Sequence, residues 1–286
     1  MRIGIRLHDT KKCPLEERLQ IVRRQGFSCV HIALGKTDGL PKETDALTPG
    51  YALWLKKVFA DAQLDMAVLG NYQNLAHPDP VKLKEIQHRY TAHLRFAALA
   101  GCGMVGTETG APNEDYHYDK EANHSAEALE IFIHNLRPVI ADAERFGVIL
   151  AIEPVYKHIV WNPKRAREVL DRIASPNLQI IFDPVNLLDP DNLDHREEVI
   201  EEAMDLLAPE IAMIHLKDYV LEDGKMNAVG CGFGEMDYRK IVEFAETKKP
   251  YIHATLENTS PETAEQSRQV IEELTNKYRK KPGGVQ

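Results

Sequence analysis

Short apolar runs alternate with longer amphipathic segments along the whole chain, at about 30 residues per repeat. The apolar runs have the length of strands and cover residues 3–7, 28–34, 65–69, 104–107, 148–153, 178–183, 211–215 and 252–257. The segments between them place apolar residues three and four positions apart, as one face of a helix requires. These segments cover residues 15–24, 53–62, 81–100, 126–146, 164–173, 197–207, 238–247 and 263–280. The pattern predicts strands and helices in strict turn.

Eight strand–helix repeats within 286 residues favour an α/β barrel. We predict a single (β/α)8 TIM barrel over residues 1–280, with residues 281–286 as a flexible C-terminal tail. A doubly wound parallel sheet is the alternative, but no GxGxxG motif follows the first strand. No change in composition marks a domain boundary.

Capping residues mark several of the predicted helix ends. A capping side chain followed by proline begins a helix at Asp79-Pro80, Asn162-Pro163 and Ser260-Pro261. Glycines at 26, 101 and 147 fall where helices should end. Two long segments depart from the regular repeat: residues 110–124 after the fourth strand and residues 220–237 after the seventh. In the second, Glu222-Asp223-Gly224-Lys225 predicts a hairpin turn.

The composition is typical of a soluble globular protein, with 43% hydrophobic and 28% charged residues. A net charge of −9 argues against a nucleic-acid partner, which normally needs a basic face. No apolar run has the length of a membrane-spanning helix, and the first residues, RIGIRLH, predict a strand rather than a signal peptide. The four cysteines have no CxxC spacing, so we expect reduced thiols in a cytoplasmic protein.

Four of the predicted strands end on a residue that can bind a metal. Glu153 and Asp183 are each followed by proline, and His215 and Glu257 follow apolar runs in the same way. The intervals are 30, 32 and 42 residues (183−153, 215−183, 257−215), which is about one repeat each. In a barrel these side chains meet at the carboxyl-end face. Residues two and four positions earlier should also point inward: Ala151, Ile149, Ile181, Gln179, Met213, Ile211, Thr255 and His253.

Three converging carboxylates repel one another unless a cation lies between them. Two glutamates, one aspartate and one histidine form an oxygen-rich ligand set that suits Mn²⁺, Mg²⁺, Co²⁺ or Fe²⁺, with catalytic Zn²⁺ also open. We therefore predict one divalent metal ion held by Glu153, Asp183, His215 and Glu257. Each residue alone could instead be a strand-end polar group bound to backbone.

The chain resembles the sugar phosphate isomerase/epimerase family of the xylose-isomerase-like barrels over nearly its whole length. The most specific segments are AIEPVYKH, IIFDPVNLL, IHLKDY with GCGFGEMD, and TLENT. The resemblance implies that the four residues above bind one divalent cation, manganese among the candidates, and that Glu153 and Glu257 are the catalytic acid and base. The metal would chelate a ketose and lower the cost of an enediolate while one glutamate removes the adjacent proton.

The resemblance leaves the reaction open. Ketose 3-epimerases of the family commonly have a histidine at the position of Asn186, and an arginine where this chain has Lys217, Asp218 and later Lys225. The main expectation is an isomerase or epimerase acting on a ketose or sugar phosphate. A dehydratase of an inosose or a dehydroshikimate-like acid is the alternative. A nuclease resembling endonuclease IV and a sugar sensor without activity are more remote.

Six residues are predicted to contact the sugar or polyol substrate: Asn71, Glu108, His158, Asn186, Lys217 and Lys225. For each of them a structural role in a loop or barrel rim is the alternative. Gly230, Gly232 and Gly234 could form a phosphate cradle, but a tight turn is favoured. Because such barrels often pair, a homodimer or homotetramer is also open.

Overall fold

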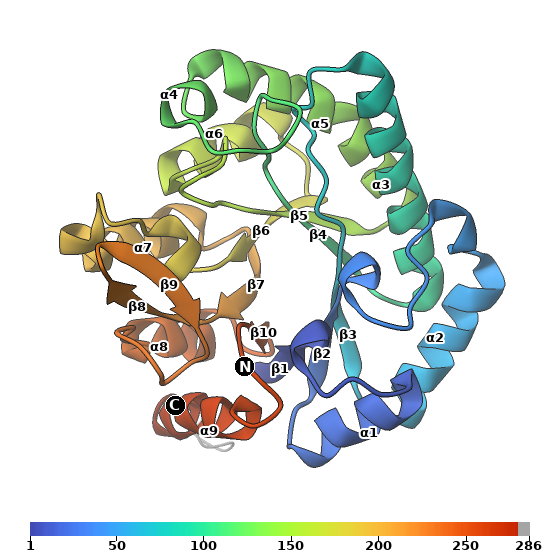
Figure 1. Ribbon diagram of the computed structural model, residues 1–286, viewed down its shortest axis with the longest axis vertical. Coiled ribbons are helices and arrows are strands. Elements are labelled where there is room, and N and C mark those ends of the chain that lie inside the picture. The colour runs from blue at the N-terminus through green and yellow to red at the C-terminus, as the bar shows by residue number, and fades with distance from the viewer. Residues whose placement is uncertain (280–286) are drawn as a thin grey trace, which may run out of the picture.

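The computed structural model describes residues 1–279; Lys280 and the tail predicted over residues 281–286 lie outside the described residues. Eight parallel strands close into a barrel in the order β1-β10-β7-β6-β5-β4-β3-β2 (Figure 1). Their bounds are β1 (Arg2–Arg6), β2 (Cys29–Ile32), β3 (Asp65–Gly70), β4 (Met104–Glu108), β5 (Ile149–Glu153), β6 (Leu178–Phe182), β7 (Ile211–Leu216) and β10 (His253–Leu256). The predicted (β/α)8 fold is confirmed.

Helices surround the barrel on its outer face (Figure 1). They are α1 (Leu15–Arg24), α2 (Pro49–Asp61), α3 (Pro80–Ala100), α5 (Ala126–Phe146), α6 (Pro163–Ile173), α7 (Arg196–Leu207), α8 (Arg239–Lys248) and α9 (Ala264–Tyr278). Each follows one barrel strand, as the alternating sequence pattern predicts. The main apolar core lies between this ring of helices and the outward faces of the strands, and includes Ile152, Phe182 and Leu256.

Most of the predicted helix ends are confirmed. The side chain of Asp79 accepts hydrogen bonds from the backbone N–H groups of the first turn of α3, and Asn162 does the same for α6. Gly101 and Gly147 end α3 and α5 with φ angles of 76° and 66°. The start of α9 differs: Ser260 caps a separate turn by accepting from the N–H of Thr263, and the helix begins later, at Ala264.

The barrel interior is filled by small and medium apolar side chains. A separate cluster there contains Cys29, Ala67, Val68, Met104, Ala151, Ile181 and Met213, with Ile149 packed against it. Ile211 was predicted to point inward but belongs to the outer core. The register between β6 and β7 explains the difference, because Ile180 pairs with Ile211 whereas Ile181 pairs with Met213. Ala212 is the extra residue of β7 at this one-residue shift. The residues of β7 before it therefore alternate between the inside and the outside of the barrel in the opposite sense to the predicted one.

The two long segments lie after β4 and β7, as predicted. The first contains the short helix α4 (Lys120–Asn123), and the second forms the antiparallel hairpin of β8 (Asp218–Glu222) and β9 (Lys225–Val229). Asp223 and Gly224 form the turn with φ angles of 50° and 72°, which confirms the predicted hairpin. Short 3-10 helices cover Leu7–Asp9, Leu34–Lys36, Thr44–Ala46, Val185–Leu187 and Leu193–His195. Among residues 1–279, no helix combines the length and apolar character needed to cross a bilayer.

Candidate metal centre

The four polar strand ends meet at the carboxyl-end face of the barrel. Glu153 is the last residue of β5, His215 lies in β7, and Asp183 and Glu257 directly follow β6 and β10. All four are at most 4% exposed. Nδ1 of His215 lies 3.3 Å from Oε2 of Glu153 and 3.3 Å from Oε1 of Glu257. The convergence predicted from their spacing is therefore present.

The donor atoms suit a divalent cation. Ligand atoms of Glu153, Asp183 and His215 lie within 4.8 Å of one another, and a second such set contains His31, His215 and Glu257. Opposite ligands in a coordination sphere are about 4.2 Å apart, so the first set needs only a small contraction to bind an ion. Neither ring nitrogen of the buried His215 has a hydrogen-bond partner, and a metal would satisfy one of them.

Lys217 places a cation among the carboxylates. Its Nζ lies 2.8 Å from Oδ2 of Asp183 and 3.7 Å from Oε2 of Glu257, and the residue is buried. Burial raises the pKa of Asp183 to about 6, against the opposing effect of Lys217. Burial also acts to lower the pKa of His215, but Glu257 and Glu153 raise it to about 9. The cluster therefore carries opposite charges that balance one another in a buried site.

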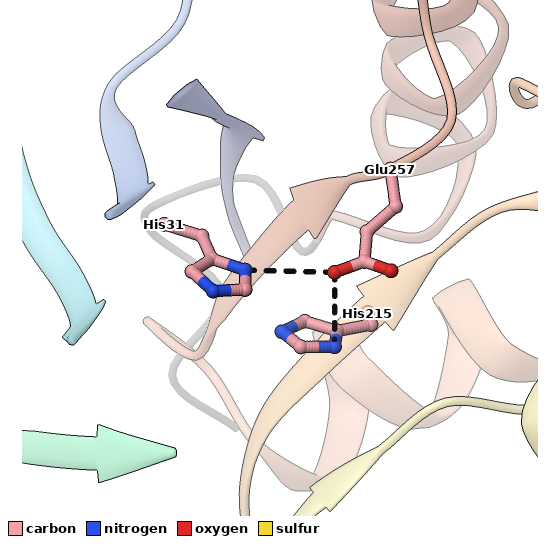
Figure 2. Close-up of side chains that lie close together, drawn as sticks. All are labelled: His31, His215 and Glu257. Carbon is pink, nitrogen blue, oxygen red and sulfur yellow. Dashed lines mark ion pairs between the residues drawn. The ribbon is translucent and has the colours of Figure 1, made fainter. Parts of the chain in front are cut away.

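Glu257 is surrounded by nitrogen donors from the first strands of the chain. Arg6 donates from its NH1 atom to Oε2 at 3.1 Å, and Nδ1 of His31 lies 3.5 Å from Oε1. Figure 2 shows the imidazoles of His31 and His215 facing the same carboxylate oxygen. Burial acts to raise the pKa of Glu257, but the charge of His215, the hydrogen bond from His31 and the charges of Lys217 and Arg6 hold it well below its ordinary value. Glu257 is thus an ionised carboxylate with a fixed orientation.

Sequence reasoning did not identify Arg6, His31 or Tyr72. His31 stacks on His215 with ring centroids 5.1 Å apart, and its Nε2 lies 2.8 Å from the hydroxyl oxygen of Tyr72. The available signal for His31 was a histidine inside the otherwise apolar run CVHIAL.

Asn186 links two of the strand ends. Its side-chain Nδ2 donates to Oε1 of Glu153 at 2.5 Å. Its backbone N–H and that of Val185 donate to Oδ1 of Asp183 at 3.1 and 3.0 Å. Asn186 therefore orients one carboxylate through its side chain and the other through its backbone.

Glu108 and His158 form one wall of the barrel mouth. Glu108 ends β4 opposite Glu153 of β5, and Tyr116 donates from its hydroxyl to Oε2 of Glu108 at 3.4 Å. Nδ1 of His158 lies 4.0 Å from the same oxygen. Burial and the charge of Glu153 raise the pKa of Glu108 to about 7, and burial lowers the pKa of His158 to about 4. These two residues meet close to Glu153, in the position predicted for substrate contacts.

The remaining predicted residues lie in different surroundings. Asn71 follows β3 and is buried, and its Nδ2 has no hydrogen-bond partner. Lys225 is exposed at the start of β9, where it pairs with Glu222 across the hairpin. Within residues 1–279, Lys225 has no hydrogen bond or ion pair to the strand-end cluster. β9 places Lys225 beside the turn of the hairpin, and its substrate contact stays a prediction.

The glycine segment after the hairpin forms a tight turn, as favoured from the sequence. The carboxylate of Asp218 accepts hydrogen bonds from the backbone N–H groups of Gly232 and Met236, at 3.1 and 2.8 Å. A Cβ atom at Gly234 would lie 2.4 Å from Oδ1 of Asp218, so only glycine fits there. The backbone N–H groups of Gly232 and Met236 are therefore bound within the turn.

Comparisons with known proteins agree with the fold. A family model described as a xylose isomerase-like TIM barrel matches residues 19–275. A search of curated protein sequences gave no match. The E. coli 3-keto-D-glucoside 4-epimerase YcjR superposes with a TM-score of 0.76 at 13% identity, covering 96% of this chain and 99% of that one.

Two further solved structures have the same fold. The probable 3-DHS dehydratase AsbF of Bacillus anthracis gives a TM-score of 0.73 at 13% identity, covering 96% and 99% of the two chains. The IOLI protein, solved with a bound zinc atom, gives 0.72 at 16% identity, covering 98% and 100%. At these identities the likeness establishes the fold, while the chemistry has to be argued from the residues of this chain.

Proposed function

Because the chain belongs to the xylose isomerase-like TIM barrel family, we propose that it is a divalent-metal-dependent isomerase or epimerase of ketoses or sugar phosphates. The observation that carries the proposal is the pair of buried glutamates, Glu153 and Glu257, each 3.3 Å from the same nitrogen of His215. Two carboxylates beside one metal-binding histidine provide both the acid and the base that a proton shift needs.

The residues proposed to hold the metal are Glu153, Asp183, His215 and Glu257. Their oxygen-rich donor set fits Mn²⁺, Mg²⁺, Co²⁺ or Zn²⁺, and the unpartnered nitrogens of His215 support the assignment. A divalent ion bound there would supply Lewis acidity for the negative charge that develops on the sugar's oxygens.

The side chains of the site supply the proton transfer. The pKa of Glu153, like that of Glu257, lies below its ordinary value, because neighbouring cations outweigh the effect of burial. Both carboxylates are therefore ionised and able to accept a proton from the carbon next to the carbonyl group. For epimerisation the second glutamate takes a proton from solvent water and returns it to the opposite face, while the first passes its proton to solvent. Return to the neighbouring carbon gives isomerisation.

Other residues are proposed to position the substrate and the glutamates. Asn186 orients Glu153, and Arg6 with His31 orients Glu257, so that each carboxylate keeps one geometry through the reaction. Asn71, Glu108, His158 and Lys217 remain proposed contacts for the hydroxyl groups of a sugar or polyol. Lys217 already neutralises Asp183, and it would also neutralise the negative charge that grows on the substrate oxygen.

The proposed substrate is a small molecule rather than a nucleic acid. Cysteines 13, 29, 102 and 231 are all free thiols, which supports the proposed cytoplasmic location. We also propose that the protein forms a homodimer or homotetramer, and we assign no residue to the interface.

Solvent exchange tests the reaction. The protein is loaded with Mn²⁺ and incubated in D₂O with ketoses, ketose phosphates and inososes, and product mass is followed. Deuterium uptake without loss of water, abolished by chelation and in Glu153→Gln, is expected. Uptake with loss of water would instead make the protein a dehydratase, and no exchange by a metal-loaded protein with any member of the panel would contradict the proposal.

A further inference from the structure

A cavity of about 320 Å³ opens beside the proposed metal centre, between the segments that follow β2 and β3. Its lining includes Lys36, Lys42, Asn71, Tyr72, Gln73 and Arg89. Three of these residues are cationic, and the only acidic residue among those described in the lining is Glu43. This local excess of positive charge lies in a protein whose net charge is −9.

The three cations of this cavity have no acidic partner. Among residues 1–279, no carboxylate oxygen lies within 4.0 Å of a side-chain nitrogen of Lys36, Lys42 or Arg89. Arg89 is held by a hydrogen bond from its NH2 atom to the backbone oxygen of Lys42 at 3.0 Å. Lys36 lies over the ring of Tyr72, with Nζ 4.2 Å from the ring centroid. The cations are thus positioned by neutral groups, which leaves their charge available to a ligand.

Two buried donors in the same lining also lack an acceptor. Asn71 is 3% exposed, and its Nδ2 has no hydrogen-bond partner. Nε of Arg89 is likewise buried without a partner. An unsatisfied buried donor is destabilising, and more so when it is charged. Since both unsatisfied groups are N–H donors, the missing ligand is an acceptor.

The cavity adjoins the proposed metal centre through a short chain of contacts. Tyr72 lines the cavity, its hydroxyl oxygen lies 2.8 Å from Nε2 of His31, and Nδ1 of His31 lies 3.5 Å from Glu257. A second cavity of about 240 Å³ adjoins the centre at Asn186 and Lys217. The charges of its other residues are balanced, since Nζ of Lys157 lies 3.6 Å from Asp189. The two cavities therefore differ in the kind of group they suit.

We propose that the cavity lined by Lys36, Lys42, Arg89 and Asn71 binds an anionic group, phosphate or carboxylate, at one end of the sugar substrate. The inference rests on the proposed function, because it assumes that the substrate's reacting carbons lie at the metal centre. The opposite, hydroxyl-bearing end of the substrate then occupies the cavity at Asn186. The glycine segment after β9 suits an anion less well, because the carboxylate of Asp218 lies there and accepts from the N–H groups of Gly232 and Met236.

Binding of inorganic phosphate to the Mg²⁺-loaded full chain, measured by calorimetry, tests the site directly. Arg89→Met should weaken phosphate binding by about tenfold or more, the value of one charge-assisted hydrogen bond. The matched control is Arg95→Met, an exposed arginine on the same helix α3, which should bind phosphate as the wild type does. Lys36→Met with Lys84→Met as its control provides a second pair, in case loss of Arg89 disturbs folding.

Equal phosphate binding by all four variants would overturn the proposal, because the phosphate would then lie on the metal or elsewhere. The kinetics of deuterium exchange distinguish a site for the substrate's anionic group from a site for a free anion. Arg89→Met should lower kcat/KM for a ketose phosphate or sugar acid much more than for a neutral ketose. A wild type that prefers the neutral ketose would contradict the proposal even if it binds phosphate. Phosphate binding that depends on Arg89, without exchange on any sugar, would contradict the proposed function and leave the anion site supported.

Discussion

The ammonium group of Lys217 lies 2.8 Å from Oδ2 of Asp183, the carboxylate that follows β6. Both groups are buried, and the negative charges of Glu153, Asp183 and Glu257 together raise the pKa of the lysine, although burial acts to lower it. Lys217 therefore neutralises the cluster in the absence of a metal, and an ion bound as proposed would compete with it for Asp183. The protein can fold with the carboxylates already converged, which favours a preformed site.

Replacement of Lys217 should destabilise the metal-free protein. Lys217→Met leaves buried carboxylates without their cation, and we expect the free energy of unfolding to fall by about 3–5 kcal/mol. Mn²⁺ should recover much of the loss, because it supplies the missing positive charge. Urea denaturation in EDTA and in Mn²⁺ measures both values. Lys225→Met, at the exposed hairpin lysine, is the matched control, and an equal loss in the two variants would refute this role for Lys217.

The side chain of Asn186 should contribute through the orientation of Glu153. Asn186→Ala removes the donor to Oε1 and should lower kcat about tenfold, with a smaller change in KM. Asn186→Asp should be more harmful, since it adds a fourth carboxylate beside Glu153. Asn186→His keeps a donor and should retain more activity than either. The order of the three kcat values is the measurement, and an aspartate variant as active as the histidine variant would contradict the assignment.

Glu108 should make stability depend on pH. Its pKa is raised to about 7 in the folded protein, from an ordinary value of 4.5, so the folded state binds the extra proton in this range. The contribution of this proton to the free energy of unfolding is complete below about pH 4.5 and is lost as the pH rises through 7. Glu108→Gln stays neutral, so the variant should gain about 1–3 kcal/mol relative to the wild type between pH 5 and 8.

Urea unfolding in EDTA at several pH values gives the difference between Glu108→Gln and the wild type. The control is Glu114→Gln, an exposed residue of the same segment after β4, which should show no such trend. A difference between Glu108→Gln and wild type that is the same at pH 5 and pH 8 would show that Glu108 is ionised throughout.

The barrel and the convergence of its strand ends could be predicted because both follow from order along the chain. The apolar runs locate the strands, and parallel strands bring Glu153, Asp183, His215 and Glu257 to one face. The direction of Ile211 could not be predicted, because the shift between β6 and β7 depends on pairing between strands. The packing of the hairpin could not be predicted for a similar reason, since the sequence predicts its turn but not where the hairpin points.

The partners of Glu257 were missed because barrel closure creates them. Arg6 and Glu257 are 251 positions apart in sequence, and they meet because β1 pairs with β10, with Gly4 opposite Thr255. His31 reaches the same carboxylate from β2. Arg6 has no local pattern that distinguishes it from an ordinary strand residue, and the histidine within CVHIAL does not by itself indicate Glu257 as its partner, so the closed barrel is needed to identify both.

Cobalt titration followed by absorption of the bound Co²⁺ tests most directly whether the four strand ends form one metal site. The account predicts one Co²⁺ per chain. His215→Gln should weaken the affinity at least about 100-fold, since residues that only orient a ligand already contribute 10–100-fold. His158→Gln, a change at a nearby half-buried histidine, should bind as the wild type does. A chain that binds no cobalt, or a His215→Gln variant with unchanged affinity, would contradict the account.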